Sequence, residues 1–213
     1  MNRDIPNHLR VRRLAERARY ERAEIDAILD DAYVAHVGLV VDGAPVVLPY
    51  ACARVGDELI LHGSTRAGAL GASAAGVPLC ATVTHLDGLV VAHSAFHSSM
   101  NYRSVVVRGS ARAVTDPAEK ARLLDAFVDH QFPGWRASFR PTSEGELSAT
   151  QVLALSLAFA SAKVRTGGPQ EPADDVRPDV WAGVVPLRML AGVPEPTPET
   201  AILAAPPLFA AVR

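Results

Sequence analysis

Two-residue turn signals repeat through the first half of this chain, and they constrain its fold more than any other feature. Three of them, Asp42-Gly43, Gly56-Asp57 and Asp87-Gly88, separate apolar runs of strand length. Aspartate and glycine favour such turns because tight hairpins require φ angles that most residues avoid. Each signal therefore predicts a β-hairpin, and the three together predict an antiparallel meander.

The segments between these turns are apolar or alternate with a period of two, which is typical of strands. The expected strands cover residues 33–41, 44–55, 58–62, 77–86, 89–92 and 103–114. Six antiparallel strands predict a mainly β fold, a barrel or a sandwich, rather than a parallel sheet. The second strand contains Pro45 and Pro49, which lack an amide donor, so we expect an unpaired edge there that a ligand could use.

Helices are expected around this β-region rather than within it. Helical spacing of apolar residues begins after Glu21, and Asp116-Pro117 supplies an N-cap and a first helical residue for another helix. Ser143 and Glu146 have the spacing of a capping box. Residues 150–164 are strongly apolar with leucines at alternate positions, which predicts one long strand, and residues 180–187 predict a final edge strand.

Composition excludes some classes of protein. The 213 residues carry a formal net charge of −2, whereas a nucleic-acid surface requires clustered basic charge. No apolar run approaches the roughly 18 residues of a membrane span, and the N-terminus lacks a signal-peptide core, so we expect a cytoplasmic protein. Cys52 and Cys80 are expected to be reduced core thiols. We expect an N-terminal arm over residues 1–20, a β-domain over 21–190 and a proline-rich tail over 191–213.

A dense polar passage, residues 93–104, precedes the apolar run 105–107. It holds two histidines, four serines, an asparagine, a tyrosine and an arginine, which exceeds the hydrogen-bonding capacity that a hairpin turn needs. One interpretation is the rim of a ligand site, and the other is an exposed polar loop. The spacing alone leaves both open.

Residues 61–70 change from a strand to glycine and hydroxyl residues and then to an alanine-rich helical run. A strand, a polar loop and a helix N-terminus together form an anion site, because free amides and the helix dipole point the same way. Ser64, Thr65 and Arg66 would then contact a phosphate. The alternative is that Ser64 or Thr65 is only an N-cap. Neither a P-loop nor a GxGxxG pattern is present.

Five motifs in this order give the chain a family resemblance. They are Asp42-Gly43 through Leu48-Pro49-Tyr50, Leu61-His62-Gly63-Ser64, the passage from Phe96 to Val105, Lys163-Val164-Arg165-Thr166-Gly167, and the run from Trp181 to Pro186. Over roughly residues 17–187 the chain resembles the pyridoxamine 5′-phosphate oxidase-like FMN-binding split-barrel proteins, in particular the branch of flavin-nucleotide-binding and nitroimidazole-resistance-type proteins. The resemblance implies a six-stranded antiparallel split barrel, a homodimer, and FMN in the grooves between subunits.

The resemblance also implies which residues contact the cofactor. The flavin ring edge would lie on Leu48, Pro49 and Tyr50, and the phosphate on the loop from His62 to Arg66, including Ser64 and Thr65. The strand entrance would contribute Asn101, Tyr102, Arg103 and Ser104, with His97 near the ring, while Lys163, Arg165 and Trp181 would close the site. The C-terminal arginine and histidine that grip phosphorylated pyridoxamine in the true oxidase have no counterpart here, so that reaction is not expected.

Two classes of function are consistent with this family resemblance. The first is an FMN-dependent oxidoreductase that acts on a small molecule, and the second is a flavin-, haem- or deazaflavin-binding protein that carries or senses without turnover. His93 and His97 have the spacing of a helical metal pair, but the local pattern is not helical, so no metal site is expected. A serine hydrolase is not expected either, because no GxSxG elbow is present.

Overall fold

The computed structural model describes residues 7, 10–65, 76 and 78–200, and the fold is mainly β, as predicted. Ten antiparallel strands lie within the described residues. They are β1 (Ala18–Arg19), β2 (Val34–Val41), β3 (Ala44–Val55), β4 (Glu58–Ser64), β5 (Pro78–Val91), β6 (Ser99–Ser110), β7 (Arg112–Ala113), β8 (Thr150–Ser156), β9 (Ala160–Arg165) and β10 (Gly183–Pro186). Eight strands were expected, six before residue 115 and two over residues 150–164 and 180–187. The strands expected at 77–86 and 89–92 are one strand, β5, whereas the segments 103–114 and 150–164 each form two strands, and β1 was not expected.

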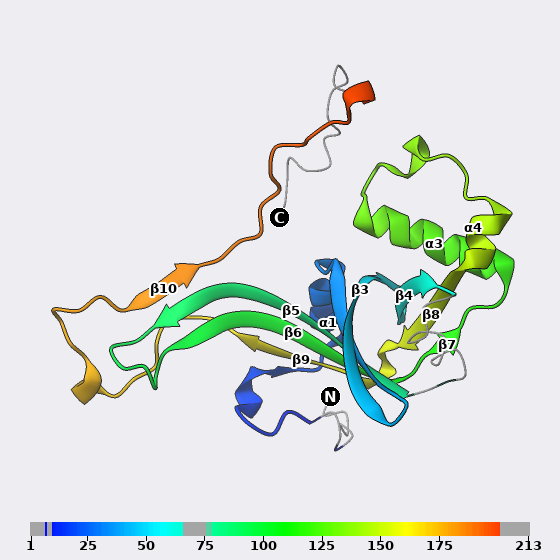
Figure 1. Ribbon diagram of the computed structural model, residues 1–213. Helices are drawn as coiled ribbons and strands as arrows, with labels where there is room; N and C mark the ends of the chain where they lie inside the picture. The colour runs from blue at the N-terminus through cyan, green and yellow to red at the C-terminus, as the bar shows by residue number, and fades with distance from the viewer. Residues whose placement is uncertain (1–6, 8–9, 66–75, 77, 201–213) are drawn as a thin grey trace.

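The sheet follows the order β1-β9-β6-β5-β2-β3-β4-β8-β7, and β10 is added to β5 (Figure 1). It is split at β3, whose residues 44–51 pair with β2 whereas residues 52–55 pair with β4. Two of the turns are those that the sequence predicts. Asp42 and Gly43 have φ angles of 50° and 78°, and Gly56 has a φ of 59°, which are the left-handed conformations of tight hairpins.

Three α-helices lie in the described part of the chain, and their starts confirm the cap predictions. They are α1 (Arg22–Asp30), α3 (Pro117–Gln131) and α4 (Glu144–Ala149). The Asp116 side chain accepts a hydrogen bond from the Glu119 amide at the start of α3. Ser143 and Glu146 form the complete capping box of α4. Single 3₁₀ turns occur at Ala15–Arg17, Arg136–Ser138, Leu157–Phe159, Ala173–Asp175 and Pro198–Thr200.

Two hydrophobic clusters stabilise the barrel. The larger one fills its interior, where fully buried side chains such as Leu29 of α1, Leu59 and Leu155 meet. The smaller one lies between α3 and the outer side of β4 and β8, and it includes Phe127 and Ile60. Burial of apolar surface at about 25 cal/mol per Å² makes these clusters the main stabilising contribution. Helix α1 therefore closes the barrel interior, and α3 covers the face of β4 and β8.

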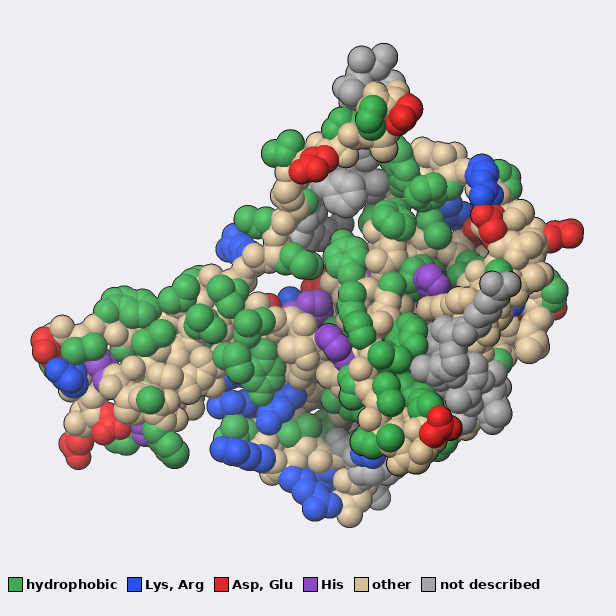
Figure 2. Space-filling model, viewed as in Figure 1, with side chains coloured by type: hydrophobic (Ala, Val, Ile, Leu, Met, Phe, Trp, Pro, Cys, Tyr) green, Lys and Arg blue, Asp and Glu red, His purple; other side chains and the backbone are tan. Residues whose placement is uncertain are grey.

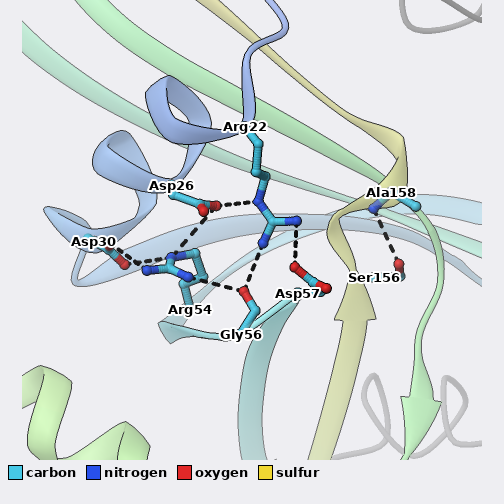
Figure 3. A network of polar contacts seen from close by, with 8 residues as sticks. All are labelled: Arg22, Asp26, Asp30, Arg54, Gly56, Asp57, Ser156 and Ala158. Carbon is cyan, nitrogen blue, oxygen red and sulfur yellow. Dashed lines mark hydrogen bonds and ion pairs between the residues drawn. The ribbon is translucent and has the colours of Figure 1, made fainter. Parts of the chain in front are cut away.

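A polar network fixes α1 to the β3–β4 turn (Figure 3). Arg54 makes a bidentate pair with Asp30, at 2.7 Å for both contacts. Arg22 reaches the Gly56 carbonyl oxygen at 2.8 Å and Asp57 at 2.8 Å. Both guanidinium groups thus link the helix to the turn, which fixes the orientation of α1 relative to the barrel.

The expected hairpin turn at Asp87-Gly88 is wrong. The chain continues through it as one strand, β5, with a bulge between Leu86 and Gly88. The reason is tertiary, because β10 pairs alongside and its Pro186 lies opposite Gly88. A Cβ atom at Gly88 would lie only 3.0 Å from the Val185 carbonyl oxygen. Glycine is therefore required here for close approach of a neighbouring strand rather than for a turn.

The single strand expected over residues 150–164 is also wrong. It divides into β8 and β9 at the 3₁₀ turn Leu157–Phe159, where the chain leaves β4 and joins β6. The Ser156 hydroxyl accepts a hydrogen bond from the Ala158 amide (Figure 3), and the Leu157 amide donates to the Asp57 carbonyl oxygen. Alternating leucines continue through the turn, so the hydrophobic pattern alone does not reveal it.

A long hairpin of β5 and β6 projects from the barrel, with β10 beside it (Figure 1). Beyond β10 the chain is extended to the 3₁₀ turn at 198–200, and the rest of the expected tail lies outside the described residues. At the other end, β1 pairs with β9, so part of the expected N-terminal arm belongs to the sheet. None of the described helices is long and apolar enough to cross a membrane.

Candidate functional site

The side of β2, β3, β5, β6 and β9 that points away from the barrel interior is here called the outer face. On β6 the residues alternate, so Val105 and Val107 are buried in the barrel while Ser104 belongs to the outer face. The register places His36 opposite both Pro49 and Thr82. Lys163 lies opposite Ser104 in the same sheet. The outer face is therefore a partly polar surface rather than a second core.

The edge of β3 beside this face lacks a partner strand among the described residues. Residues 44–51 pair on one side with β2, and β4 takes up the other side only from Cys52 onward. Pro45 and Pro49 both lie in the half that is paired on one side, which confirms the expected unpaired edge. Leu48 and Tyr50 are half-buried and Pro49 is exposed. Within the described ranges no strand takes up the backbone carbonyl and amide groups along this edge, which are the groups that a planar polar ligand needs.

Three cationic side chains gather where β9 meets β6 and β1. Lys163 donates to the Arg13 carbonyl oxygen at 3.2 Å, and neither Lys163 nor Arg165 pairs with a described carboxylate. Arg17, close enough to lower the pKa of Arg165, has only a 3.9 Å contact with the exposed Glu16. Figure 2 shows Lys and Arg side chains gathered on the surface below the base of the projecting hairpin. Uncompensated positive charge of this kind favours an anionic ligand.

Arg165 is the most constrained member of this group, with 6% of its surface exposed. Its guanidinium donates to the Asn101 side-chain oxygen and to the carbonyl oxygens of Gly167 and Gly168. Burial, and then the charge of Arg17, lower its pKa. Among the described residues this buried guanidinium has neutral acceptors and no counterion, and a buried charge of that kind is costly unless an anion binds. Asn101 and Arg165 are thus brought together, as expected of neighbouring site residues.

Arg103 lies on the opposite side of β6 from Tyr102 and Ser104. Its guanidinium contacts Asp87 at 3.1 Å and Asp31, the residue after α1, at 2.8 Å. Two carboxylates already neutralise it, in contrast to Lys163 and Arg165. The structure therefore separates Arg103 from the cations of the outer face, although the sequence places it beside them.

The tip of the β5–β6 hairpin, residues 92–98, is held by the loop that precedes β10. Both ring nitrogens of His93 face acceptors, Nδ1 the Glu171 carboxylate at 2.7 Å and Nε2 the Val180 carbonyl oxygen at 3.1 Å. The hydrogen bond to Glu171 is the main cause that raises the pKa of His93. His97 contacts Asp175 at 3.5 Å. The histidines of the polar passage thus fasten a loop, which accounts for much of its polarity.

The remaining expected site residues are dispersed. Trp181 is 62% exposed and lies over Gly183, where a Cβ atom would be 3.1 Å from the indole ring. His62 is edge-on to Phe127 beneath α3, with ring centroids 4.4 Å apart, and burial lowers its pKa. Ser64 ends β4 and Thr65 donates its amide to the Ala149 carbonyl oxygen. Arg66 lies outside the described residues.

Sequence reasoning missed several polar residues of the outer face. His36, Thr82 and Thr84 sit in apolar strands, and only the register shows that they share one face with Ser104 and Lys163. Strict alternation along each strand was the available signal. No group of three or more His, Cys, Asp or Glu side chains that could hold a metal ion occurs in the described ranges.

Comparison with known proteins places this architecture in a family. The chain is 40% identical to the flavocytochrome Anf3 from Azotobacter vinelandii, over 94% of each chain with a TM-score of 0.87. It is also 40% identical to the FAD and heme binding protein from Mycobacterium smegmatis, over 91% of this chain and 96% of that one, with a TM-score of 0.86. A putative 5-nitroimidazole antibiotic resistance protein from Bacteroides thetaiotaomicron shares the fold at 22% identity, over 69% and 86% of the chains, with a TM-score of 0.58.

A search of curated proteins found no match. The sequence model of one family, described as pyridoxamine 5′-phosphate oxidase, matches residues 21–164, which is more than half of the chain. That span runs from the start of α1 into β9 and contains β2 to β8 and nearly all of β9. The chain therefore belongs to the pyridoxamine 5′-phosphate oxidase family of split-barrel proteins.

Proposed function

We propose that this protein binds a flavin on its outer face and works as a redox protein. The observation that carries the proposal is a pair of cations, Lys163 and the buried Arg165, that make no ion pair with a described carboxylate and lie on the same sheet as a strand edge with no described partner. A flavin phosphate requires positive charge, and the pyrimidine side of the flavin ring requires hydrogen-bonding groups. The residues present fit both needs.

A bound flavin supplies the electron-transfer chemistry, whereas the protein supplies binding and orientation. Lys163, Arg165 and Arg17 would hold phosphate oxygens. The backbone at Leu48, Pro49 and Tyr50 would meet the ring edge. None of these residues needs to act as an acid or a base, which agrees with an outer face that lacks a described carboxylate paired to Lys163 or Arg165.

FAD is the flavin that we favour, although the sequence alone led to FMN. Two relatives that are 40% identical over more than nine-tenths of this chain carry titles that name a flavocytochrome and a FAD and heme binding protein. Three cations also suit a diphosphate better than a single phosphate. Denaturing the purified protein and chromatographing the released cofactor tests this choice, since recovery of FMN alone would contradict it.

Haem is a second cofactor that we propose on the same basis, which makes the protein a flavocytochrome. An oxidoreductase that passes electrons between flavin and haem is then the activity that fits best. We also propose a homodimer, because valines at positions 34, 40 and 47 of the outer face are 46–67% exposed and large exposed apolar surface is rare on monomers. A monomer by light scattering at micromolar concentration would count against the dimer.

The two lysines of the chain provide a matched test of the flavin site. Lys163→Gln removes a cation of the outer face, whereas Lys120→Gln removes a cation that binds the Leu147 and Thr150 carbonyl oxygens near α4. A lost charge-assisted contact is worth about 1.5–3 kcal/mol, so flavin affinity should fall roughly 10- to 150-fold in Lys163→Gln. Lys120→Gln should retain affinity. Fluorescence quenching titrations measure both, and equal affinities in the two variants would refute the proposed site.

A further inference from the structure

We propose that three exposed arginines near the N-terminus form a docking surface for a small acidic electron-carrier protein that supplies electrons to the flavin. This inference rests on the proposed flavin function and goes beyond it by naming the kind of partner and the surface that binds it. The surface, here called the arginine patch, consists of Arg10, Arg12 and Arg13. It continues into the cations Arg17 and Lys163 of the proposed flavin site.

The segment that carries the arginine patch concentrates positive charge. Residues 10–19 hold five arginines and one glutamate, whereas the whole chain has a formal net charge of −2. Arg10, Arg12 and Arg13 are exposed and make no ion pair with a carboxylate of the described residues. Like charges this close repel one another. A negatively charged partner would relieve a repulsion that the described part of the chain does not.

Contacts with the sheet hold the arginine patch in place. Strand β1 pairs with β9, and the Lys163 ammonium donates to the Arg13 carbonyl oxygen at 3.2 Å. The Val11 amide donates to the Tyr20 hydroxyl at 2.9 Å. Because these contacts order the segment before a partner arrives, docking would cost little conformational entropy.

A strained residue lies directly after the arginine patch. Leu14 has a φ of 56° and a ψ of 57°, the left-handed conformation that leucine rarely adopts. Its carbonyl oxygen accepts a hydrogen bond from the Arg17 amide at 3.0 Å, which forms the 3₁₀ turn that leads into β1. The Leu14 side chain is 40% exposed, so its packing contributes little to offset the strain. Strained backbone of this kind is typical of functional segments.

The position of the arginine patch favours an electron carrier among acidic partners. Lys163, which contacts the backbone of the patch, also belongs to the proposed flavin site, so a protein bound here would lie beside the flavin. Figure 2 shows the Lys and Arg side chains gathered below the base of the projecting hairpin. Reduction of one flavin to the hydroquinone would consume two protons from solvent and two electrons, one from each of two reduced carriers, and both carriers would leave oxidised by one electron.

The small extent of the arginine patch favours a small protein over a membrane or a nucleic acid. Electron-transfer encounters bury less than about 1,200 Å² in total, so a short basic segment can supply much of one side. A bilayer or a duplex would extend beyond the patch and meet the rest of the chain, in which carboxylates outnumber cations. A local patch is sufficient to steer an acidic protein and raise its association rate.

The test uses the full flavin-loaded chain, with a small acidic ferredoxin and a flavodoxin as probes and biolayer interferometry as the binding assay. The unmodified chain should bind at least one probe, and affinity should fall about ten-fold between about 50 and 200 mM salt. Arg12→Glu combined with Arg13→Glu should weaken binding about ten-fold or more, mainly through the association rate. The same two positions changed to Gln should give a smaller loss in the same direction.

The matched control is Arg122→Glu combined with Arg188→Glu. It changes the net charge equally at two exposed arginines, one on α3 and one after β10, that make no ion pair with a described carboxylate. This control should keep its affinity for the carrier within about two-fold. Flavin content and melting temperature, measured for every variant, separate a loss of docking from a loss of folding.

The rate of flavin reduction gives a second readout. Reduced carrier in excess should reduce the flavin about ten-fold more slowly in the Arg12→Glu, Arg13→Glu variant than in the control. Dithionite, a small reductant that needs no docking surface, should reduce both at rates within about two-fold of each other.

The possible outcomes have different meanings. Equal affinity of the patch and control variants, or no binding of either carrier, would overturn the docking surface and leave the flavin function standing. Binding of anionic vesicles or duplex DNA instead of a carrier, lost in the patch variant, would overturn it in favour of a membrane or a nucleic acid. Patch-dependent binding without flavin reduction would overturn the electron-carrier role. A chain that takes up no flavin would overturn the proposed function and this inference with it.

Discussion

Arg103 offers the sharpest test of how the two sides of β6 differ. Its guanidinium bridges Asp87, in the β5 bulge, and Asp31, at the end of α1, through contacts of 2.8–3.2 Å. The three side chains are 33%, 35% and 52% exposed, so solvent screens both pairs. Exposed ion pairs contribute about 0.2–1 kcal/mol each, and the two pairs together should contribute roughly 0.4–2 kcal/mol to the free energy of unfolding.

Arg103→Gln should therefore lower the melting temperature of the cofactor-free protein by about 1–8 °C, since about 1 kcal/mol corresponds to about 2–4 °C in a chain of this size. Flavin affinity should stay within about two-fold, because the side chain points away from the outer face. Thermal unfolding and a flavin titration measure the two effects. The control is the double variant with Asp87→Asn, in which the two stability losses should be less than additive. An unchanged melting temperature together with a ten-fold loss of flavin affinity would refute the reasoning and indicate that Arg103 contacts the cofactor.

Three further predictions concern elements that position the site. Leu29→Ala, in the fully buried plug of the barrel, should lower the free energy of unfolding by about 2–5 kcal/mol in denaturant titrations; a loss below about 1 kcal/mol would contradict its place in the core. Asp116→Ala removes the N-cap of α3 and should cost about 1 kcal/mol in the same assay, with Asp116→Asn close to neutral as its control. Because the pKa of His93 is raised in the folded protein, its pairing with Glu171 should be complete below about pH 6.5 and lost as pH rises through the folded pKa. Hydrogen exchange of residues 169–180 should then increase with pH by more than the intrinsic exchange rate does. His93→Gln should abolish that dependence. Equal pH dependence in both proteins would argue against this role of the His93–Glu171 pair.

Local patterns in the sequence predict those parts of the fold that depend on local chemistry. The β2–β3 turn at Asp42-Gly43 and the capping box at Ser143 are satisfied within a few residues, so their signals suffice. The turn prediction at Gly88 failed because glycine is required there by the close approach of β10, a strand almost 100 residues later in the sequence. The prediction of a single strand over residues 150–164 failed for the same reason. The turn that divides it is held by the hydrogen bond from Leu157 to Asp57, which is distant in sequence.

The candidate site was harder to predict than the fold. Proximity in sequence grouped Arg103 with Tyr102 and Ser104, but alternation along β6 sends them to opposite sides of the sheet. Arg165 and Asn101, 64 positions apart, were grouped only through the family resemblance, and the structure brings their side chains into hydrogen-bonding contact. His36 carries no local signal at all, because only the register of β2 with β3 and β5 places it on the outer face.

The hydrogen bond from the Leu157 amide to the Asp57 carbonyl oxygen also has a consequence for the order of folding. It joins residues 100 positions apart, and β4 finds its second partner only in β8, which begins at Thr150. During synthesis the β2–β4 meander will form early, because its contacts are local. The last strand of this meander, β4, contains Leu59, Ile60 and Leu61 in succession. One edge of β4 stays unpaired until some 85 further residues have been synthesised. The nascent chain is therefore most prone to aggregation in that interval, and a chaperone that covers an apolar strand edge would act there.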